Sequence, residues 1–110
     1  MKNGKNAGLW MAQMDEGALG SAGTAVSVTI TNKRGLHARA AARFVKLAAQ
    51  FDAQVFVAKK GTEVSGLSIM GLMMLAAAPG CAIDLRAEGP QAEAAVAALL
   101  TLVQNKFDED

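Results

Sequence analysis

The sequence has few of the residues that stabilise small proteins by special means. It contains one cysteine, Cys81, so no disulfide can form within the chain, and this fits a reducing compartment. Aromatic residues make up only 5% of the chain, and tyrosine is absent. Because hydrophobic residues nevertheless make up 52%, the sequence predicts an aliphatic core of Ala, Leu, Val and Met.

Long apolar runs and an excess of one charge are also missing. No apolar run approaches the roughly 20 residues that span a bilayer, and Asp15 and Glu16 stand where a secretory signal needs its apolar centre. We therefore expect a cytoplasmic protein without membrane insertion. The net charge of +1 excludes a field over the whole molecule that would attract nucleic acid or lipid.

The chain divides into a short leader and one domain. Residues 1–23 are rich in Gly, Ala, Asn and Ser and show no sustained periodicity, so we expect a flexible N-terminal leader. The remaining residues, 24–110, are predicted to form a single domain. They end in Asp108-Glu109-Asp110, which we interpret as a solvated acidic end.

Alternating apolar residues predict four strands, and apolar residues three and four apart predict three helices. In the second helix, Leu72, Leu75 and Ala76 are expected to face the core. The strands are expected at residues 25–31, 53–59, 62–65 and 81–87, and the helices at residues 38–50, from Ser68 to a stop at Pro79-Gly80, and from Gly89-Pro90 through Phe107.

The resulting order is βαββαβα. Strands with one apolar face need a helical layer on that side only. The sequence therefore predicts an α+β fold, an open-faced sandwich in which a four-stranded antiparallel sheet is covered on one side by three helices.

The only histidine, His37, lies between a glycine-containing loop and the first predicted helix, so it should occupy the cap or first position of that helix. The first turn of a helix has amide N–H groups without intrahelical partners and about half a positive charge, which suits phosphate. A neutral imidazole placed there can attack a phosphoryl donor, and the helix end together with Arg39 can hold the dianion. A structural cap without chemistry is the alternative.

Two motifs resemble the HPr family, the small phosphocarrier proteins of the bacterial phosphotransferase system. The run Gly-Leu-His-Ala-Arg-Ala-Ala, from Gly35 to Ala41, is similar to the phosphohistidine motif of the family, and the run from Ser68 to Leu75 is similar to its second helix. The resemblance covers residues 25–107 and implies the HPr fold. The ending after Gly89 is similar to that of the nitrogen-branch subgroup, NPr.

The resemblance implies a carrier with protein partners. Enzyme I, charged by phosphoenolpyruvate, would phosphorylate His37 on Nδ1, and an Enzyme IIA-type protein would accept the group. A carrier must hold its phosphoryl group without hydrolysing it, so we expect a monomer with no independent turnover, no cofactor and no metal. The acceptor could belong to a sugar-uptake branch or to a regulatory, nitrogen-type branch, and the ending of the chain favours the regulatory branch.

Ser68 is the candidate regulatory site, because the resemblance places it where an HPr-type serine kinase/phosphorylase acts in many members. Serine is also a preferred N-cap, so a capping role alone is the alternative. If the second helix buries its core side, its other apolar residues form an exposed patch that partners can contact. We expect partners to dock on Ile69, Met70 and Met73 of this patch, and on Arg43 of the first helix.

A ferredoxin-like nucleic-acid-binding module is the alternative from a different class, suggested by Lys59, Lys60 and the arginines near His37. Such modules stack bases on several aromatic residues of the sheet. Here only Phe56 could face outward from a strand, so the alternative is not favoured. An independent hydrolase or a zinc site lacks the necessary residues.

Overall fold

A computed structural model describes residues 24–109, so the predicted leader at residues 1–23 and Asp110 lie outside the described residues. Within this range the order of elements is the predicted βαββαβα, followed by one short 3-10 turn. The bounds are β2 (Thr24–Thr29), α1 (Ala38–Ala48), β3 (Gln54–Lys59), β4 (Thr62–Ser65), α2 (Ile69–Met74), β5 (Ala82–Glu88), α3 (Ala92–Gln104) and η2 (Lys106–Asp108).

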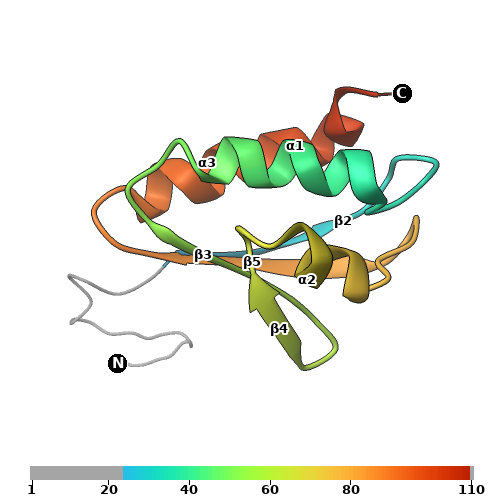
Figure 1. Cartoon of the computed structure of the whole chain (residues 1–110), viewed down its shortest axis with the longest axis horizontal. Coiled ribbons are helices and arrows are strands. Elements are labelled where there is room, and N and C mark those ends of the chain that lie inside the picture. The colour runs from blue at the N-terminus through green and yellow to red at the C-terminus, as the bar shows by residue number, and fades with distance from the viewer. Residues whose placement is uncertain (1–23, 110) are drawn as a thin grey trace.

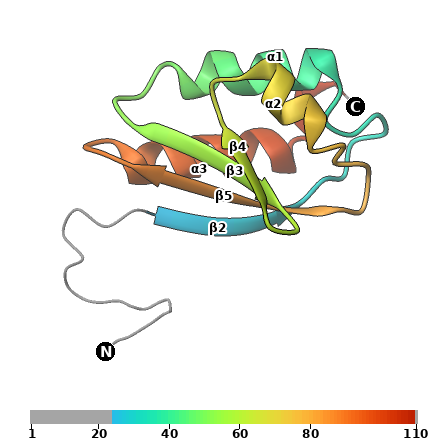
Figure 2. The same ribbon diagram turned by 60° about the horizontal axis from the view of Figure 1, so that its bottom comes forward.

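The four strands form one antiparallel sheet in the order β2-β5-β3-β4, and α1, α2 and α3 all lie on one face of it (Figure 1, Figure 2). Leu85 of the central strand β5 lies opposite Val26 on one side and Val57 on the other. Directly paired residues point to the same face of a sheet, so this register gathers apolar side chains under the helices. The predicted open-faced sandwich is confirmed.

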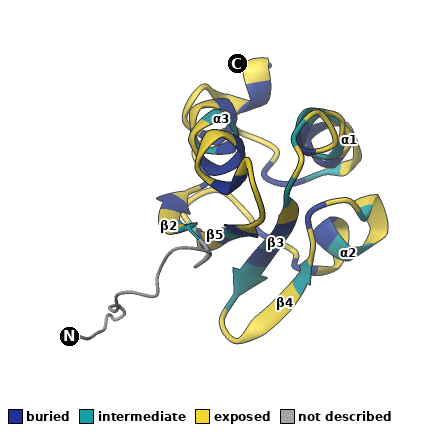
Figure 3. Cartoon of the chain, turned by 90° about the vertical axis from the view of Figure 1, so that its left-hand side faces the viewer, coloured by how far each residue is buried: buried dark blue, intermediate teal, exposed yellow. Residues whose placement is uncertain are grey.

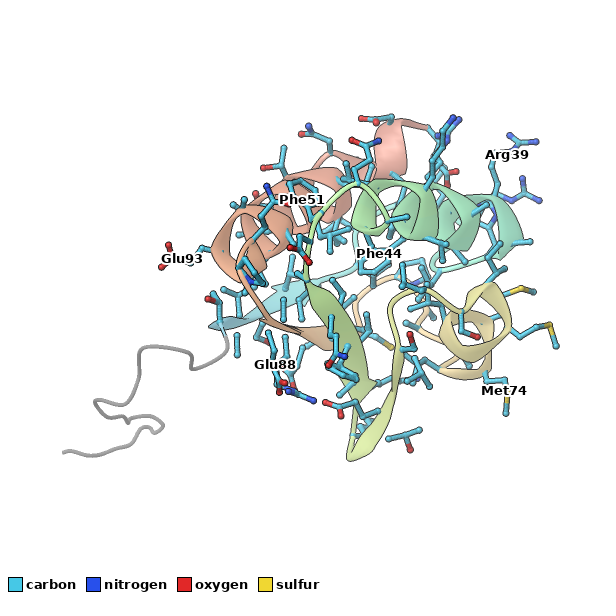
Figure 4. All side chains as sticks on the ribbon, turned by 60° about the vertical axis from the view of Figure 1, so that its left-hand side comes forward. Arg39, Phe44, Phe51, Met74, Glu88 and Glu93 are labelled. Atoms are coloured by element: carbon cyan, nitrogen blue, oxygen red, sulfur yellow. The ribbon has the colours of Figure 1, made fainter. Side chains whose placement is uncertain are left out.

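The core lies between the sheet and the three helices, where the buried residues gather (Figure 3). It is mostly aliphatic, as predicted, with two fully covered rings, Phe44 of α1 and Phe107 of η2. The predicted contribution of methionine was wrong, because Met70, Met73 and Met74 are exposed on α2 and isoleucine is buried instead. Figure 4 shows Phe44 directed from α1 into the interior. None of the helices within residues 24–109 combines the length and the apolar character that crossing a membrane requires.

The predicted end of the second helix was wrong. Helix α2 ends at Met74, and Ala76 is exposed with a left-handed φ of 52°, while Ala77 is buried in its place. The left-handed residue breaks the helical path, and the Lys59 ammonium donates hydrogen bonds of 3.1 Å to the carbonyl oxygens of both Leu75 and Ala76. These free carbonyls are therefore satisfied by a side chain from the neighbouring hairpin.

The predicted course of the C-terminus was also wrong. Helix α3 ends at Gln104, and Phe107 belongs to a left-handed turn in which Lys106, Phe107 and Asp108 have φ values of 57°, 55° and 61°. This conformation costs a non-glycine residue roughly 1–2 kcal/mol. The turn places the Phe107 ring in the core and redirects the following residue, Glu109, toward the start of α1.

Candidate functional site

His37 is the N-cap of α1, as the sequence predicted. The loop before it is held closely, because the Leu36 amide donates to the Ala77 carbonyl oxygen at 2.9 Å and the Leu36 side chain is buried. Gly35 has a φ of +65°, and a Cβ there would lie 2.5 Å from the same Ala77 oxygen, so only glycine fits. The imidazole makes no capping hydrogen bond, which leaves the amides of the first turn of α1 without a side-chain partner.

One ring nitrogen of His37 is engaged. Nε2 lies 2.9 Å and 3.0 Å from the two carboxylate oxygens of Glu109, and the side chains of His37 and Glu109 are only 20% and 10% exposed. An ionised carboxylate only accepts hydrogen bonds, so Nε2 carries the hydrogen. Within residues 24–109, Nδ1 has no hydrogen-bond partner. The neutral ring therefore keeps its lone pair on Nδ1.

Asn32 supports this contact from beneath. Its side-chain amide is fully buried and donates to Glu109 Oε1 at 2.9 Å and to the Gly35 carbonyl oxygen at 2.8 Å. Its own Oδ1 has no partner among the described residues. Leaving a buried oxygen without a hydrogen bond costs free energy. The amide keeps this orientation because it donates two hydrogen bonds in it. One side chain thus ties the loop before His37 to the carboxylate.

Arg43 of α1 holds the left-handed turn that precedes Glu109. Its guanidinium donates to the carbonyl oxygen of Phe107, in the middle of the left-handed turn. The hydrogen bond from His37, the one from Asn32 and the charge of Arg43 together hold the pKa of the Glu109 carboxyl below its ordinary value, although burial opposes the shift. The acidic end is therefore part of the site, and the prediction that it is solvated was wrong at Glu109.

The predicted phosphate ligand Arg39 lies on the exposed side of α1, two residues after His37. Figure 4 shows its side chain extending away from the helix. No hydrogen bond or ion pair joins its guanidinium to another described residue, so it is available to an anion. Within residues 24–109 there is also no cluster of three or more His, Cys, Asp or Glu side chains suited to a metal ion.

Ser68 is the N-cap of α2, and its hydroxyl accepts a hydrogen bond of 2.9 Å from the Gly71 amide. Around it lies an apolar patch of large exposed side chains. Met70 and Met74 are the most accessible, at 69% and 78%, and Figure 4 shows Arg39 and Met74 projecting from the same side of the molecule. The members of the apolar patch are Leu67, Ile69, Met70, Met73 and Met74.

The outer face of the sheet does not suit the alternative function. Phe56 faces outward, but the Arg86 guanidinium covers it, 4.2 Å from the ring centre. Arg86 is in turn paired with Glu63 at 3.0 Å and with Glu88. An aromatic ring already stacked under an arginine, flanked by two carboxylates, offers no platform for a base.

Sequence reasoning predicted roles for His37, Arg39 and Ser68 but did not single out Asn32 or Glu109. A signal existed for Asn32, because the alternation of Val26, Val28 and Ile30 continues to position 32 and predicts an inward side chain there. No local pattern identifies Glu109. Its role depends on the left-handed turn and on a contact between residues 72 positions apart.

Comparisons with known proteins show which family the chain resembles. Residues 25–105 match the family model described as "PTS HPr component phosphorylation site". The phosphocarrier protein HPr of Cupriavidus necator is 48% identical over 81 residues, covering 74% of this chain and 91% of that protein. The phosphocarrier protein NPr of Escherichia coli K12 is 45% identical over 85 residues, covering 76% and 94%.

Solved structures show the same architecture. The crystal structure of HPr-C-His from Thermoanaerobacter tengcongensis superimposes with a TM-score of 0.76 at 44% identity. The match covers 79% of this chain and 98% of the other. At this identity the likeness is one of sequence as well as of fold.

Proposed function

The chain belongs to the HPr family of phosphocarrier proteins of the phosphotransferase system, and we propose that His37 is the residue that carries its phosphoryl group. One observation supports this above all. Glu109 engages Nε2, so the ring presents Nδ1 with a lone pair at the N-terminus of α1. The unpaired amides and dipole of that helix end favour a dianion at this place.

The transfer needs two protein partners. Enzyme I, charged by phosphoenolpyruvate, would donate the phosphoryl group, and an Enzyme IIA-type protein would accept it from His37. The protein then acts as a carrier without turnover of its own. Its relatives include proteins named HPr and proteins named NPr, and the NPr names favour a regulatory, nitrogen-type branch.

The test is to mix the protein with Enzyme I and phosphoenolpyruvate and to follow its mass. We expect one added phosphoryl group that is lost in acid and retained in base, as a phosphoramidate requires. A panel of IIA-type proteins from sugar and nitrogen branches then identifies the acceptor. An acid-stable product, or none, would contradict the proposal. The expected monomeric state and cytoplasmic location remain predictions.

Arg39→Ala should slow phosphoryl transfer without unfolding the protein. A hydrogen bond to a charged group contributes about 1.5–3 kcal/mol, so the rate should fall about ten- to hundredfold. The exposed position of Arg39 predicts a change in unfolding free energy within about 0.5 kcal/mol. Stopped-flow transfer rates measure the effect, and Lys46→Ala, an exposed cation further along α1, is the matched control. Equal rates for both variants would remove Arg39 from the site.

The apolar patch is the proposed docking surface for Enzyme I, and Arg43, on the side of α1 that faces the C-terminal turn, is a further proposed docking residue. Met70→Glu places a charge where a partner must remove water, so binding should weaken at least about tenfold. Because Met70 is 69% exposed, the melting temperature should hardly change. Ala94→Glu introduces the same charge on the exposed side of α3, which packs over β2 and β5 instead of β4, and should bind normally. Equal weakening by both would argue against the patch.

We propose Ser68 as the site where an HPr-type serine kinase/phosphorylase regulates docking. A phosphate there carries about −1.5 to −2 charges next to the apolar patch, yet the N-terminus of α2 tolerates it. Ser68→Asp should keep its melting temperature, since aspartate caps well, but should slow transfer about tenfold. Ser68→Ala separates the effects, because it loses about 1 kcal/mol of capping and adds no charge. Normal transfer by Ser68→Asp would leave Ser68 as a cap only.

A further inference from the structure

The C-terminal turn is built for a contact that neither the fold nor the phosphoryl carrier function alone explains. Three successive non-glycine residues adopt left-handed backbone conformations to bring Glu109 back to α1. Such conformations persist only where the surroundings enforce them. Here the buried Phe107 ring and the hydrogen bond from Arg43 to the Phe107 carbonyl oxygen supply the enforcement.

The carboxylate delivered by this turn meets two donors. His37 Nε2 lies 2.9 Å from Oε1 and 3.0 Å from Oε2, and the buried Asn32 amide donates to Oε1 at 2.9 Å. Because Asn32 holds Oε1 from below, the carboxylate cannot rotate away without losing a buried hydrogen bond. The groups that face it are thus His37 and Asn32 at the start of α1, with the charge of Arg43 nearby.

From this geometry we infer that Glu109 is a positioning residue for phosphoryl transfer, which holds His37 in the Nε2–H tautomer and balances the charge that the ring gains. The inference rests on the proposed function of His37. The same division of roles operates in catalytic triads, where a carboxylate orients a histidine and stabilises its cation.

The chemistry of the step requires such a partner. The Nδ1 lone pair of the neutral ring attacks phosphorus, the new N–P bond forms, and the bond from phosphorus to the donor atom breaks, with its electron pair leaving on the donor. No proton leaves His37, because Nε2 keeps its hydrogen. The phosphorylated ring therefore gains one positive charge, opposite the carboxylate at Nε2. When the acceptor takes the group, the N–P electron pair returns to Nδ1.

Two variants separate the tautomer from the charge. Glu109→Ala removes both, so the unphosphorylated ring should become a mixture of Nε2–H and Nδ1–H forms. Glu109→Gln retains an oxygen that can accept from Nε2–H, so the tautomer should persist while the charge is lost. Asp108→Asn is the matched control, because it removes a neighbouring exposed charge and asparagine tolerates a left-handed backbone.

The experiment is long-range ¹H–¹⁵N NMR of the His37 ring in the full chain at neutral pH, combined with transfer rates from Enzyme I. We expect a pure Nε2–H ring in the parent protein, in Asp108→Asn and in Glu109→Gln, and a mixture in Glu109→Ala. Transfer should slow about tenfold in Glu109→Gln and up to about a hundredfold in Glu109→Ala, the range seen when carboxylates that orient metal-bound histidines are removed.

An unchanged ring spectrum and an unchanged rate in Glu109→Ala would overturn the inference. An unchanged rate with a tautomer mixture would also overturn it, because the contact would then be structural only. Failure of the parent protein to take up any phosphoryl group is a different result: it contradicts the proposed function, while the ring spectra still report whether Glu109 selects the tautomer.

Discussion

Replacement of His37 by alanine is expected to abolish phosphoryl uptake from Enzyme I completely. The described residues offer no second imidazole, and His37 is the only histidine in the chain. The unpaired amides at the start of α1 and the exposed Arg39 can hold a phosphate, but they cannot form a covalent bond to it. Mass spectrometry under basic conditions measures the loss directly.

The fold should survive this change. The His37 side chain is 20% exposed, and its side-chain partner is Glu109, which keeps its hydrogen bond from Asn32. Loss of one hydrogen bond to a charged group costs about 1.5–3 kcal/mol, which is less than the stability of a typical domain. Circular dichroism of the variant should therefore resemble that of the parent. A folded His37→Ala protein that still accepts one acid-labile group would overturn the assignment.

Replacement of Phe107 by alanine should produce the largest loss of stability. The ring is fully buried, and truncation of a buried phenylalanine costs about 3–5 kcal/mol. The left-handed turn would also lose the packing that enforces it, so Glu109 should detach from His37. We expect a large fall in the urea midpoint and, in the fraction that remains folded at low temperature, slower phosphoryl transfer.

A matched control uses the same truncation on the other side of the sheet. Phe56 is partly exposed on the outer face, where it packs under Arg86. Phe56→Ala should therefore cost only about 1 kcal/mol, with normal transfer. Equal destabilisation by the two truncations, or normal transfer by Phe107→Ala, would show that the C-terminal turn is not needed for the site.

The sequence alone determined the layers of the molecule and the place of its reactive residue. Val55 and Val57 alternate with outward residues in β3, and Ala41, Phe44 and Ala48 recur along α1, so each element declares its buried face through a local period. His37 lies at a strand-to-helix junction whose chemistry follows from the helix end itself. These properties depend on neighbours in the chain, and a local pattern can therefore predict them.

Because such patterns depend only on neighbours in the chain, they also led to the wrong predictions. The pattern of Leu72, Leu75 and Ala76 is helical, but α2 ends at Met74, because Ala76 turns left-handed and Lys59 of the preceding hairpin satisfies the free carbonyls. Pro79-Gly80 does exclude a helix, but it lies beyond Met74, where α2 has already ended. A helix end that is satisfied by a side chain from another element cannot be located from its own residues.

The tertiary structure alone decided which charges act on His37. The sequence predicts Arg43 as a residue for partner docking, and the structure shows that its guanidinium also donates to the carbonyl oxygen of Phe107. Glu109 belongs to an acidic tripeptide typical of solvated ends, yet it contacts a ring 72 positions away. Both outcomes follow from the burial of Phe107, which offsets the conformational cost of a turn that its own residues disfavour. Such a contact exists only once α1, α3 and the sheet have packed, so it is a property of the closed core and not of any segment of the chain.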